Sequence, residues 1–535
     1  MSFLDPASVA GKVPPIDLTT DLLIIGAGPA GMSAALTAAG RGVRVTLVDE
    51  NPIPLKTMGE DVPLHFGGRM APTLANQNAV LVRVVEANPQ LLQAMDAGVD
   101  VRLGTAVWGL FPQHPTAAWL GGPVAGLADI ESVYLMRFKQ VIVATGRQDM
   151  GLAFAGWQRP GVMGVSAAYR LASTYNALDA KVAVLVGSDT EALQAANALA
   201  ETGVRIEAII EQSAQITGSP RLLASLTSRG TRVFTGHVIQ EARGDHTGVT
   251  STRIVEIDAT GRHLSERTQT LTCDTLLLGI GAVPTIELVE AGGCAISFQA
   301  ERGGHVPRID ASQRTSLPCV YVAGDCAGIW PSKTLSETIA TQEGRIAANA
   351  ALSALGVPSQ KEAPVTPDTP TRDLSADRLA WVRASVISSS ADPLVCQCEE
   401  VTASEVLSLK APRYLGWTSK TSCRHQHELP PNPDAVKRLT RAGMGPCQGR
   451  RCREQIAALI ALDSKLTLAD IPPATYRPPV RPLTLEQMAR LPESAALAPH
   501  WDSWFGMPTQ WIPFWRVQPD YTAATRNSNE PAGGE

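Results

Sequence analysis

A glycine-rich turn between two apolar strands is the sequence feature that most restricts how this chain can fold. Leu22–Ile25 is a continuous apolar run, typical of a parallel strand that is covered on both faces. The turn Gly26-Ala-Gly-Pro-Ala-Gly31 follows it, then an alanine-rich helix that stops before Gly40, and then a β-branched strand over residues 43–48. This order predicts a nucleotide-binding βαβ unit and therefore an α/β fold.

The three glycines of this turn have different roles in holding a dinucleotide. Gly26 allows the tight turn, Gly28 lets the backbone approach a pyrophosphate, and Gly31 lets the helix pack closely on the strand. The helix N-terminus adds free N–H groups and the positive end of its dipole, and the acidic residue that ends the second strand can bind a ribose. A purely structural turn is the alternative. The residues expected to bind the cofactor here are Gly26, Gly28, Pro29, Ala30, Gly31, Asp49 and Glu50.

Two later segments indicate which dinucleotide is bound. Ala144-Thr145-Gly146 closes one strand, and Gly324-Asp325 follows another, where a carboxylate can bind a ribityl hydroxyl. In this order, with the N-terminal turn, they resemble the flavoproteins with two dinucleotide-binding domains, such as glutathione-reductase-like and ferredoxin-reductase-like enzymes. The resemblance covers residues 20–355. It implies FAD held by these segments, with Gly68 in a further turn on the flavin side.

A second strand–turn–helix–strand unit, over residues 181–210, has a damaged fingerprint. Its turn reads Gly187-Ser-Asp-Thr-Glu-Ala192, in which only the first glycine remains. Asp189 and Glu191 put negative charge where pyrophosphate oxygens would lie, and no arginine pair follows the next strand to hold a 2′-phosphate. In the flavoproteins that the chain resembles, this unit binds a nicotinamide cofactor. We therefore expect a fold remnant that no longer binds NAD(P).

Five of the nine cysteines lie between residues 396 and 452, and such clustering in a cytosolic chain favours metal binding over disulfides. The pairs Cys396-x-Cys398 and Cys447-x₄-Cys452 supply four thiolates, which suit zinc or an iron–sulfur cluster. Glycines around Cys447 let backbone N–H groups point at cluster sulfides, and C-x-C is uncommon for zinc, so we favour [2Fe-2S] over zinc or no metal. The remaining cysteines expected to be core residues are Cys273, Cys294, Cys319 and Cys326.

The cysteine-rich segment resembles the [2Fe-2S] domain of bacterioferritin-associated ferredoxin, which also occurs in nitrite reductases and in some amine-oxidising flavoproteins. The matching phrases are Cys-Gln-Cys-Glu-Glu-Val-Thr at residues 396–402 and Thr-Arg-Ala-Gly-Met-Gly-Pro-Cys-Gln-Gly at residues 440–449. The resemblance implies that the cluster ligands are Cys396, Cys398, Cys447 and Cys452. The interval between the pairs is longer than in that family, and its insert carries Cys423 as an alternative ligand.

Composition and charge exclude several classes of protein. With 535 residues, 44% hydrophobic and 18% charged, the chain is expected to fold into several domains rather than to be disordered. Its net charge of −5 argues against a nucleic-acid partner. It shows no apolar run of the roughly 20 residues that cross a bilayer and no export signal at its start, so a cytoplasmic location is expected. The expected parts are an FAD-binding domain (17–150 and 273–355), an inserted degenerate NAD(P)-type domain (151–272), a linker (356–392), a [2Fe-2S] domain (393–465) and a Pro/Trp-rich tail (466–535).

Together, these parts resemble the larger subunit of opine oxidases and of bacterial hydrogen cyanide synthase, and the α subunits of related proline, hydroxyproline and sarcosine dehydrogenases. In that family a second FAD subunit, of the D-amino-acid-oxidase type, dehydrogenates the amine. The resemblance implies an electron-transfer subunit of a hetero-oligomer, whose partners are an oxidase-like FAD subunit with a small ferredoxin-like subunit. A flavin accepts two electrons and releases them singly, and a [2Fe-2S] centre carries one at a time, which agrees with such a relay.

Two other functions stay open on the sequence alone. One is a self-contained NAD(P)H-dependent reductase of a ferredoxin or rubredoxin, and the other is a non-catalytic assembly subunit. No catalytic acid or base stands out. The tail carries six aromatic residues between Trp501 and Trp515, which either wrap over the chain's own domains or contact a partner subunit.

Overall fold

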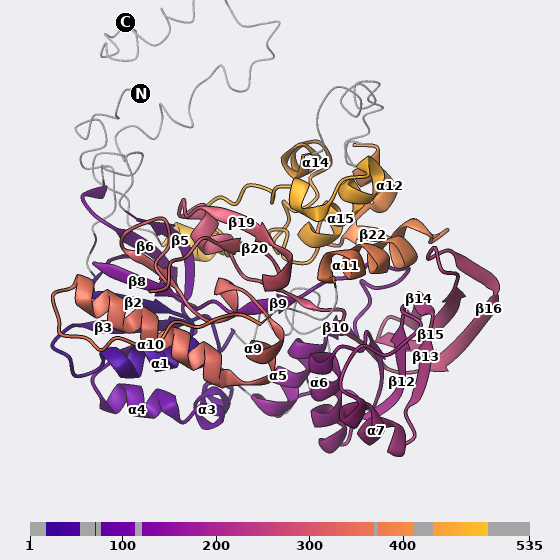
Figure 1. Ribbon diagram of the computed structural model, residues 1–535, viewed down its shortest axis with the longest axis horizontal. Coiled ribbons are helices and arrows are strands. Elements are labelled where there is room, and N and C mark those ends of the chain that lie inside the picture. Colours follow the sequence, from indigo (N-terminus) through magenta and orange to yellow (C-terminus); the bar gives the residue numbers. More distant parts are fainter. Residues whose placement is uncertain are drawn as a thin grey trace, which may run out of the picture.

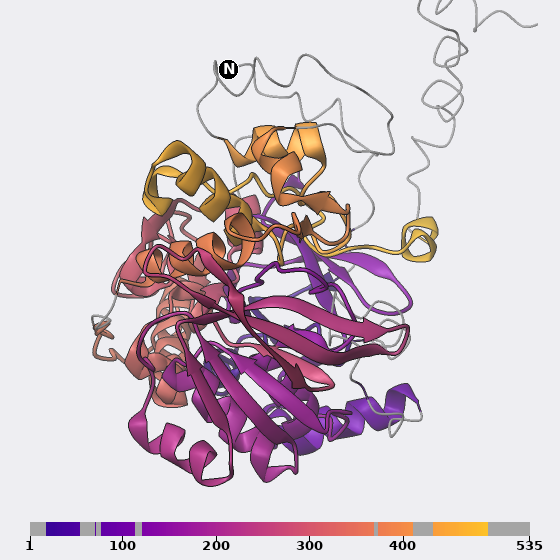
Figure 2. The ribbon, with the colours of Figure 1, turned by 90° about the vertical axis from the view of Figure 1, so that its right-hand side faces the viewer.

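Two parallel sheets and a cysteine-rich unit make up the part of the chain that the computed structural model describes, namely residues 16, 18–53, 70, 76–112, 120–368, 373–409 and 432–490. The first sheet and its helices lie on the left of Figure 1, and the second sheet lies on the lower right. The cysteine-rich unit lies along one side of both, as the two views in Figures 1 and 2 show. Among the described residues, no helix has the length and apolar character needed to cross a membrane.

The first sheet contains the predicted N-terminal βαβ unit. Its parallel strands are, in sheet order, β21 (Val320–Val322), β8 (Gln140–Val143), β2 (Leu22–Ile25), β3 (Val45–Asp49) and β4 (Asp100–Leu103). The residues of β2 are all buried, as expected for a strand between two layers. Helix α1 (Pro29–Ala38) packs against the long helix α10 (Glu337–Ala354), which brings the late part of the chain back to the N-terminal unit.

The second sheet is built in the same way from the middle of the chain. Its parallel strands are β10 (Val162–Gly164), β17 (Thr275–Leu278), β11 (Val182–Val186), β12 (Arg205–Glu211) and β13 (Arg232–Thr235). Helix α6 (Thr190–Glu201) follows β11, as the sequence predicts. The chain passes between the two sheets through a pair of antiparallel strands, β9 (Arg147–Asp149) and β18 (Ala282–Pro284).

Smaller antiparallel sheets and helices complete the two units. The antiparallel partners in the first unit are β5 (Ala106–Phe111), β6 (Val124–Ala128) and β7 (Val133–Arg137), with β1 (Leu18–Thr19) parallel to β7. The meander beside the second sheet is β14 (His237–Asp245), β15 (Gly248–Ile257) and β16 (His263–Thr272). A two-stranded ribbon pairs β19 (Ile296–Gln299) with β20 (Gly304–Pro307). Among the described residues, the remaining α-helices of the two units are α3 (Gln77–Ala87), α4 (Gln90–Asp96), α5 (Val165–Ser173), α7 (Pro220–Ser228), α8 (Glu287–Ala291) and α9 (Pro331–Leu335).

The stretch expected to be a linker contains packed structure. Helix α11 (Leu374–Val382) begins at Asp373, whose side chain accepts hydrogen bonds from the first N–H groups of the helix, and one π-helical turn (Arg383–Ile387) follows it. Trp381 on this helix is 1% exposed. Its apolar neighbours include residues of both the second sheet and the cysteine-rich unit, so this segment fastens the two together.

The cysteine-rich unit is a small helical unit with one two-stranded ribbon. Its elements are β22 (Leu394–Cys396), β23 (Val401–Thr402), α12 (Ala403–Leu407), α14 (Pro433–Thr440) and α15 (Arg453–Ser464). After α15 the chain returns to the first unit, where the backbone N–H of Val480 bonds to the carbonyl of Trp108 on β5. It then forms the short helix α16 (Leu485–Ala489). The aromatic tail lies outside the described residues.

Candidate functional site: a dinucleotide cradle beside a cysteine cluster

The first glycine-rich turn has the close backbone contacts that its fingerprint predicts. Gly26 has φ +107°, and a Cβ placed on it would lie 2.3 Å from the carbonyl oxygen of Ala144. A Cβ on Gly31 would lie 1.8 Å from the carbonyl oxygen of Gly26. Gly28, in contrast, has no atom within 4 Å of the place of its missing side chain. The turn is therefore closed on the protein side and open at Gly28, which is the space that a pyrophosphate needs.

The acidic residues after β3 are held by neighbouring groups. Asp49 accepts hydrogen bonds from the backbone N–H of Ala27 at 2.6 Å and of Asn51 at 2.7 Å. Burial raises the pKa of Asp49, although these bonds oppose the rise. Glu50 forms an ion pair at 2.8 Å with Arg481, from the segment that returns after the cysteine-rich unit. The sequence predicts Glu50 as a cofactor contact, and its carboxylate has this protein partner in the structure.

The structure brings the two other predicted FAD segments to the same cradle. Residues 144–146 follow β8 beside Gly26, and Gly324 lies so close to α1 that an added Cβ would be 3.0 Å from the Cβ of Ala30. The turn at Gly324 is fixed by a buried ion pair at 2.7 Å between Lys333 and Glu343. Glu343 accepts from the N–H of Gly324 at 2.8 Å, and Lys333 donates to its carbonyl at 2.7 Å. The predicted turn at Gly68 lies outside the described residues.

Lys333 and Glu343 are functional candidates that the sequence analysis missed. Both side chains are almost fully buried, at 0% and 1% exposure, and together they shape the turn that carries Asp325. A buried lysine needs a partner of opposite charge, and α10 supplies it. No motif surrounds either residue in the sequence, so the pair becomes visible only once α9 and α10 are placed against the turn.

In the damaged second turn, carboxylates of the chain itself accept hydrogen bonds from the turn and from the helix that follows it. Gly187 has φ +96° and a close contact to the backbone of Gly279, as in the first turn. Asp189, however, caps α6 by accepting from the N–H of Ala192 at 2.8 Å. Glu211, at the end of β12, accepts from the Ser188 hydroxyl at 2.7 Å. The helix N-terminus that would bind a phosphate thus already has a carboxylate on it.

An arginine missed by the sequence analysis connects the two turns. Arg147, directly after the predicted FAD turn, forms ion pairs with Glu191 on α6 and, at 3.3 Å, with Asp325. Burial raises the pKa of Glu191 to about 8, although the guanidinium of Arg147 opposes this rise. The ion pairs of Arg147 therefore join the helix of the second turn to the turn that carries Asp325.

The four predicted ligand cysteines come together at the start of α15. Cys396, Cys447 and Cys452 are buried and Cys398 is half-buried, and none forms a disulfide. A hydrogen bond with Cys398 lowers the pKa of Cys447. A similar contact with Cys452 lowers the pKa of Cys396. Each contact therefore joins one cysteine of the first pair to one of the second.

Glycines lie close to two of the four cysteines. The N–H of Gly443 points at the sulfur of Cys396 at 3.5 Å, and a Cβ on Gly445 would lie 2.3 Å from the Cβ of Cys398. Within the described ranges, no group of three or more His, Cys, Asp or Glu side chains is arranged to hold a single metal ion. Cys423 lies outside those ranges. The two thiol contacts bring together four sulfurs, a donor set that a thiolate-bound metal centre can use.

The arginines near the cysteines are largely engaged with other groups. Arg453 pairs with Glu287 at 2.8 Å, and both side chains are buried. Burial raises the pKa of Glu287, but Arg453 and other cations outweigh it, so the pKa is lowered overall.

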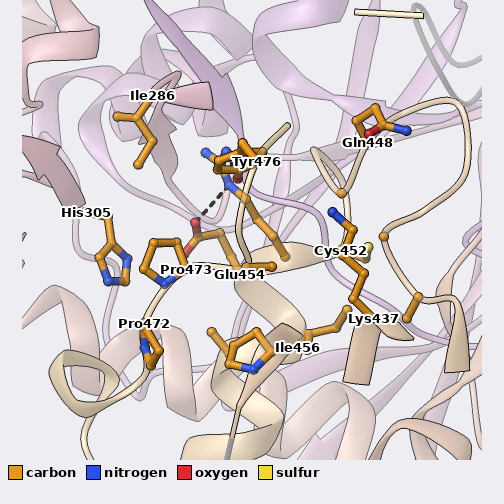
Figure 3. Close-up of a pocket in the computed structure, with 17 residues that line it drawn as sticks. Ile286, His305, Lys437, Gln448, Cys452, Glu454, Ile456, Pro472, Pro473 and Tyr476 are labelled. Atoms are coloured by element: carbon orange, nitrogen blue, oxygen red, sulfur yellow. Dashed lines mark hydrogen bonds and ion pairs between the residues drawn. The ribbon is translucent and has the colours of Figure 1, made fainter. Parts of the chain in front are cut away.

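A small cavity of about 40 Å³ lies beside Cys452; Figure 3 shows Cys452 and Lys437 on one side of it and His305 and Ile286 on the other.

The other cysteines are packing residues where the structure describes them. Cys273 belongs to the core under the second sheet, and Cys294 and Cys326 belong to the core of the first unit. Cys319 is half-buried against that same core. These four positions agree with the prediction.

The ion pair between Glu50 and Arg481 leads to a pH-dependent expectation. Arg481 lowers the pKa of Glu50 from 4.5 to about 2, so the pair stabilises the fold above about pH 5 and its contribution is lost as the pH falls toward 2. Arg481→Gln should therefore lower the free energy of unfolding by about 1 kcal/mol or less near neutral pH, because Glu50 is partly exposed. The deficit should shrink as the pH falls to about 3. Urea unfolding of Arg481→Gln and of the unsubstituted protein, near neutral pH and at about pH 3, measures this loss in the free energy of unfolding.

A matched control is Arg490→Gln, which removes an ion pair with Glu486 in which both side chains are exposed. It should change stability little at either pH. An Arg481→Gln deficit that grows on acidification would contradict the assigned pair.

Comparisons with known proteins agree with this architecture. The pyridine nucleotide-disulphide oxidoreductase family matches residues 20–352, and the sarcosine oxidase A3 domain matches residues 432–490. An opine oxidase subunit of Agrobacterium tumefaciens is 29% identical over 89% of this chain and 92% of its own length. The hydrogen cyanide synthase subunit HcnB of Pseudomonas aeruginosa is 26% identical over 80% of this chain and 90% of its own.

Among solved structures, the L-proline dehydrogenase of P. horikoshii is similar, with a TM-score of 0.57 and 20% sequence identity over 88% of this chain and 80% of that one. This likeness supports the fold. The predicted resemblance to the larger subunits of opine oxidase and hydrogen cyanide synthase is confirmed by the named relatives.

Proposed function

We propose, from the premise that this chain belongs to the pyridine nucleotide-disulphide oxidoreductase family, that it is the electron-transfer subunit of a multi-subunit amine or amino-acid dehydrogenase. The family match covers the two sheets and their nucleotide-type turns. The opine oxidase relative is matched over 89% of this chain and the hydrogen cyanide synthase relative over 80%. The substrate classes under this proposal are opines, imino acids, N-alkyl amino acids and glycine.

The observation that carries the proposal is a direct contact between the two candidate cofactor sites. The side chain of Gln148, two residues after the FAD turn, donates to the carbonyl of Arg450 at 3.0 Å. Arg450 lies between Cys447 and Cys452. When bound, FAD takes up electrons in pairs and releases them one at a time, and a [2Fe-2S] cluster carries them singly. Two such sites in contact suit a relay rather than two unrelated functions.

The residues proposed to hold FAD are those of the cradle. The turn over residues 26–31 offers N–H groups and open space at Gly28, and Asp49 and Asp325 offer carboxylates for hydroxyl groups. The proposed cluster ligands are Cys396, Cys398, Cys447 and Cys452. Side chains of the chain exclude water from three of these four sulfurs, which favours a thiolate-bound cluster.

A self-contained NAD(P)H-dependent reductase is the main alternative. Against it, Asp189 caps the helix that would hold the pyrophosphate, and Glu191 on the same helix pairs with Arg147. The family name includes disulphide reduction, but the chain carries no C-x₂-C or C-x₄-C pair before residue 396. A scaffold without redox function leaves the buried cysteine contacts unexplained.

Partners and location follow from the same proposal. The amine would be oxidised on an oxidase-like FAD subunit, and the hetero-oligomer would also contain a small ferredoxin-like subunit. The cytoplasmic location stays a prediction.

Anaerobic reduction of the purified complex tests the function. We expect at least one secondary amine or amino acid of the named classes to bleach the flavin and to produce the EPR signal of a reduced cluster. NADH and NADPH should do so slowly or not at all. If NADPH reduced the flavin and the cluster but no amine did, the result would favour the NAD(P)H-dependent reductase over the amine dehydrogenase subunit.

A further inference from the structure

A continuous strip of chain, residues 148–157, connects the predicted FAD turn to both cysteine-bearing segments. It begins with the bond from Gln148 to Arg450. Gly151 lies so close to the cysteine-rich unit that a Cβ on it would be 2.4 Å from the carbonyl oxygen of Arg451. The N–H of Ala153 then donates to the side chain of Gln455 at 2.6 Å. The strip thus follows the segment that carries Cys452, one contact after another.

Trp157, at the end of this strip, contacts both cysteine-bearing segments. Its indole N–H donates to the carbonyl of Leu394, and its own carbonyl accepts from the side chain of Gln397 at 3.2 Å. The guanidinium of Arg451 lies over its ring, 5.5 Å from the centroid. Leu394 precedes Cys396 on β22, Gln397 lies between the first two cysteines, and Arg451 immediately precedes Cys452.

The fold holds this side chain rigidly. Trp157 is 0% exposed and shares one apolar core with Cys396 and Cys452. The preceding residue, Gly156, has φ +81°, and a Cβ on it would lie 2.2 Å from the carbonyl oxygen of Ala242. The tryptophan is therefore fixed from the second unit while it bonds to the cysteine-rich unit.

We propose that Trp157 is a positioning residue that sets the arrangement of the two cysteine pairs and their distance from the FAD turn. The inference rests on the proposed function, because it assigns the residue to the cluster site. Groups that hold the ligand-bearing backbone from outside orient the ligands, and their loss alters both metal affinity and the properties of the centre. Three contacts from one rigid residue, spread over both segments, meet that description.

The test compares Trp157→Phe and Trp157→Ala with a matched replacement elsewhere. Trp157→Phe keeps an aromatic ring but removes the bond to Leu394, and we expect a shifted EPR spectrum and a shifted reduction potential with FAD content unchanged. Trp157→Ala should retain iron about 10- to 100-fold more weakly. The control is Trp330→Phe, since Trp330 is 2% exposed and its indole N–H has no hydrogen-bond partner among the described residues. It should leave the cluster signal as it is.

Hydrogen exchange separates this inference from the proposed function. In Trp157→Phe, amides of residues 394–398 and 450–455 should exchange faster than in the unsubstituted protein, whereas amides of the first sheet should not. If the unsubstituted protein held no iron, the proposed function would be overturned. Faster amide exchange in Trp157→Phe would even then support the positioning role of Trp157. Unchanged exchange together with an unchanged EPR spectrum in Trp157→Phe would overturn the inference.

Discussion

Replacing Cys447 by serine should remove the proposed iron–sulfur cluster while FAD stays bound. Cys447 is 3% exposed and contacts Cys398 from the other pair, so its loss breaks one of the two contacts that join the pairs. A serine hydroxyl holds its proton at neutral pH and is a poor ligand for iron in a cluster, whereas a cysteine thiolate is the usual ligand. We expect the iron content and the EPR signal to fall to background.

The matched control for this replacement is Cys294→Ser. Cys294 is also buried, at 5% exposure, but it bonds to Thr315 in the core of the first unit. Its replacement should leave iron and FAD unchanged at the cost of a small loss in stability. A full complement of iron in Cys447→Ser would contradict the ligand assignment, and loss of iron in Cys423→Ser would show that the insert supplies a ligand instead.

The loss of the cluster should also divide the reaction into two parts. If this chain is a relay, Cys447→Ser in the complex should leave the reduction of flavin by amine intact. Transfer of electrons to a one-electron acceptor should fall sharply. The cysteine site, which the contact between Gln148 and Arg450 joins to the FAD turn, then holds no cluster to carry them. Stopped-flow spectroscopy distinguishes the two steps.

The sequence predicts the nucleotide-type units well because their signals are local. A continuous apolar strand, a glycine turn and an alanine-rich helix each depend on a few consecutive residues, and the structure contains them at Leu22–Ile25 and Pro29–Ala38. The second unit shows the same order around Gly187. A positive φ at Gly26 and Gly187 is a backbone requirement that a single residue type reveals.

The contacts that join the units could not be predicted in this way. Arg147 meets Glu191 and Asp325, which lie far apart in the sequence, and an isolated arginine after a glycine gives no sign of either partner. Trp157 follows the short apolar run Leu152–Ala155, and nothing in the sequence around it points to the cysteine-bearing segments. Both roles depend on how whole units pack, which no periodicity records.

Composition also obscured one packed segment. Residues 356–392 are rich in Pro, Ser, Thr and Asp, which favours a linker, yet Leu374–Val382 is a helix with a buried tryptophan. A local signal was present, since Asp373 is a good N-cap and Leu374, Leu379, Trp381 and Val382 are apolar. When composition is averaged over residues 356–392, the many polar residues and prolines on either side of this helix hide its short apolar stripe.

A pair of glycine replacements in the first turn should separate binding of FAD from folding of the cradle. Gly28→Ala places a methyl group in open space, and its φ of −73° suits any residue, so the fold should be unaffected. The same methyl group would lie where the backbone must approach the pyrophosphate, and we therefore expect a large loss of FAD affinity. Gly31→Ala, in contrast, forces a Cβ to within 1.8 Å of the carbonyl oxygen of Gly26, so α1 must move away from β2.

Thermal unfolding of the FAD-free protein and titration with FAD distinguish the two variants. Gly28→Ala should melt like the unsubstituted FAD-free protein but bind FAD at least about tenfold more weakly, which corresponds to about 1.4 kcal/mol. Gly31→Ala should melt lower and lose FAD as well, because overpacking of a close helix–strand contact costs about 1–3 kcal/mol or more. Normal FAD affinity in Gly28→Ala would mean that the pyrophosphate does not lie at this turn. Equal melting of Gly31→Ala and the unsubstituted protein would show that α1 accommodates the methyl group, and the close approach of helix and strand would then not be what the third glycine provides.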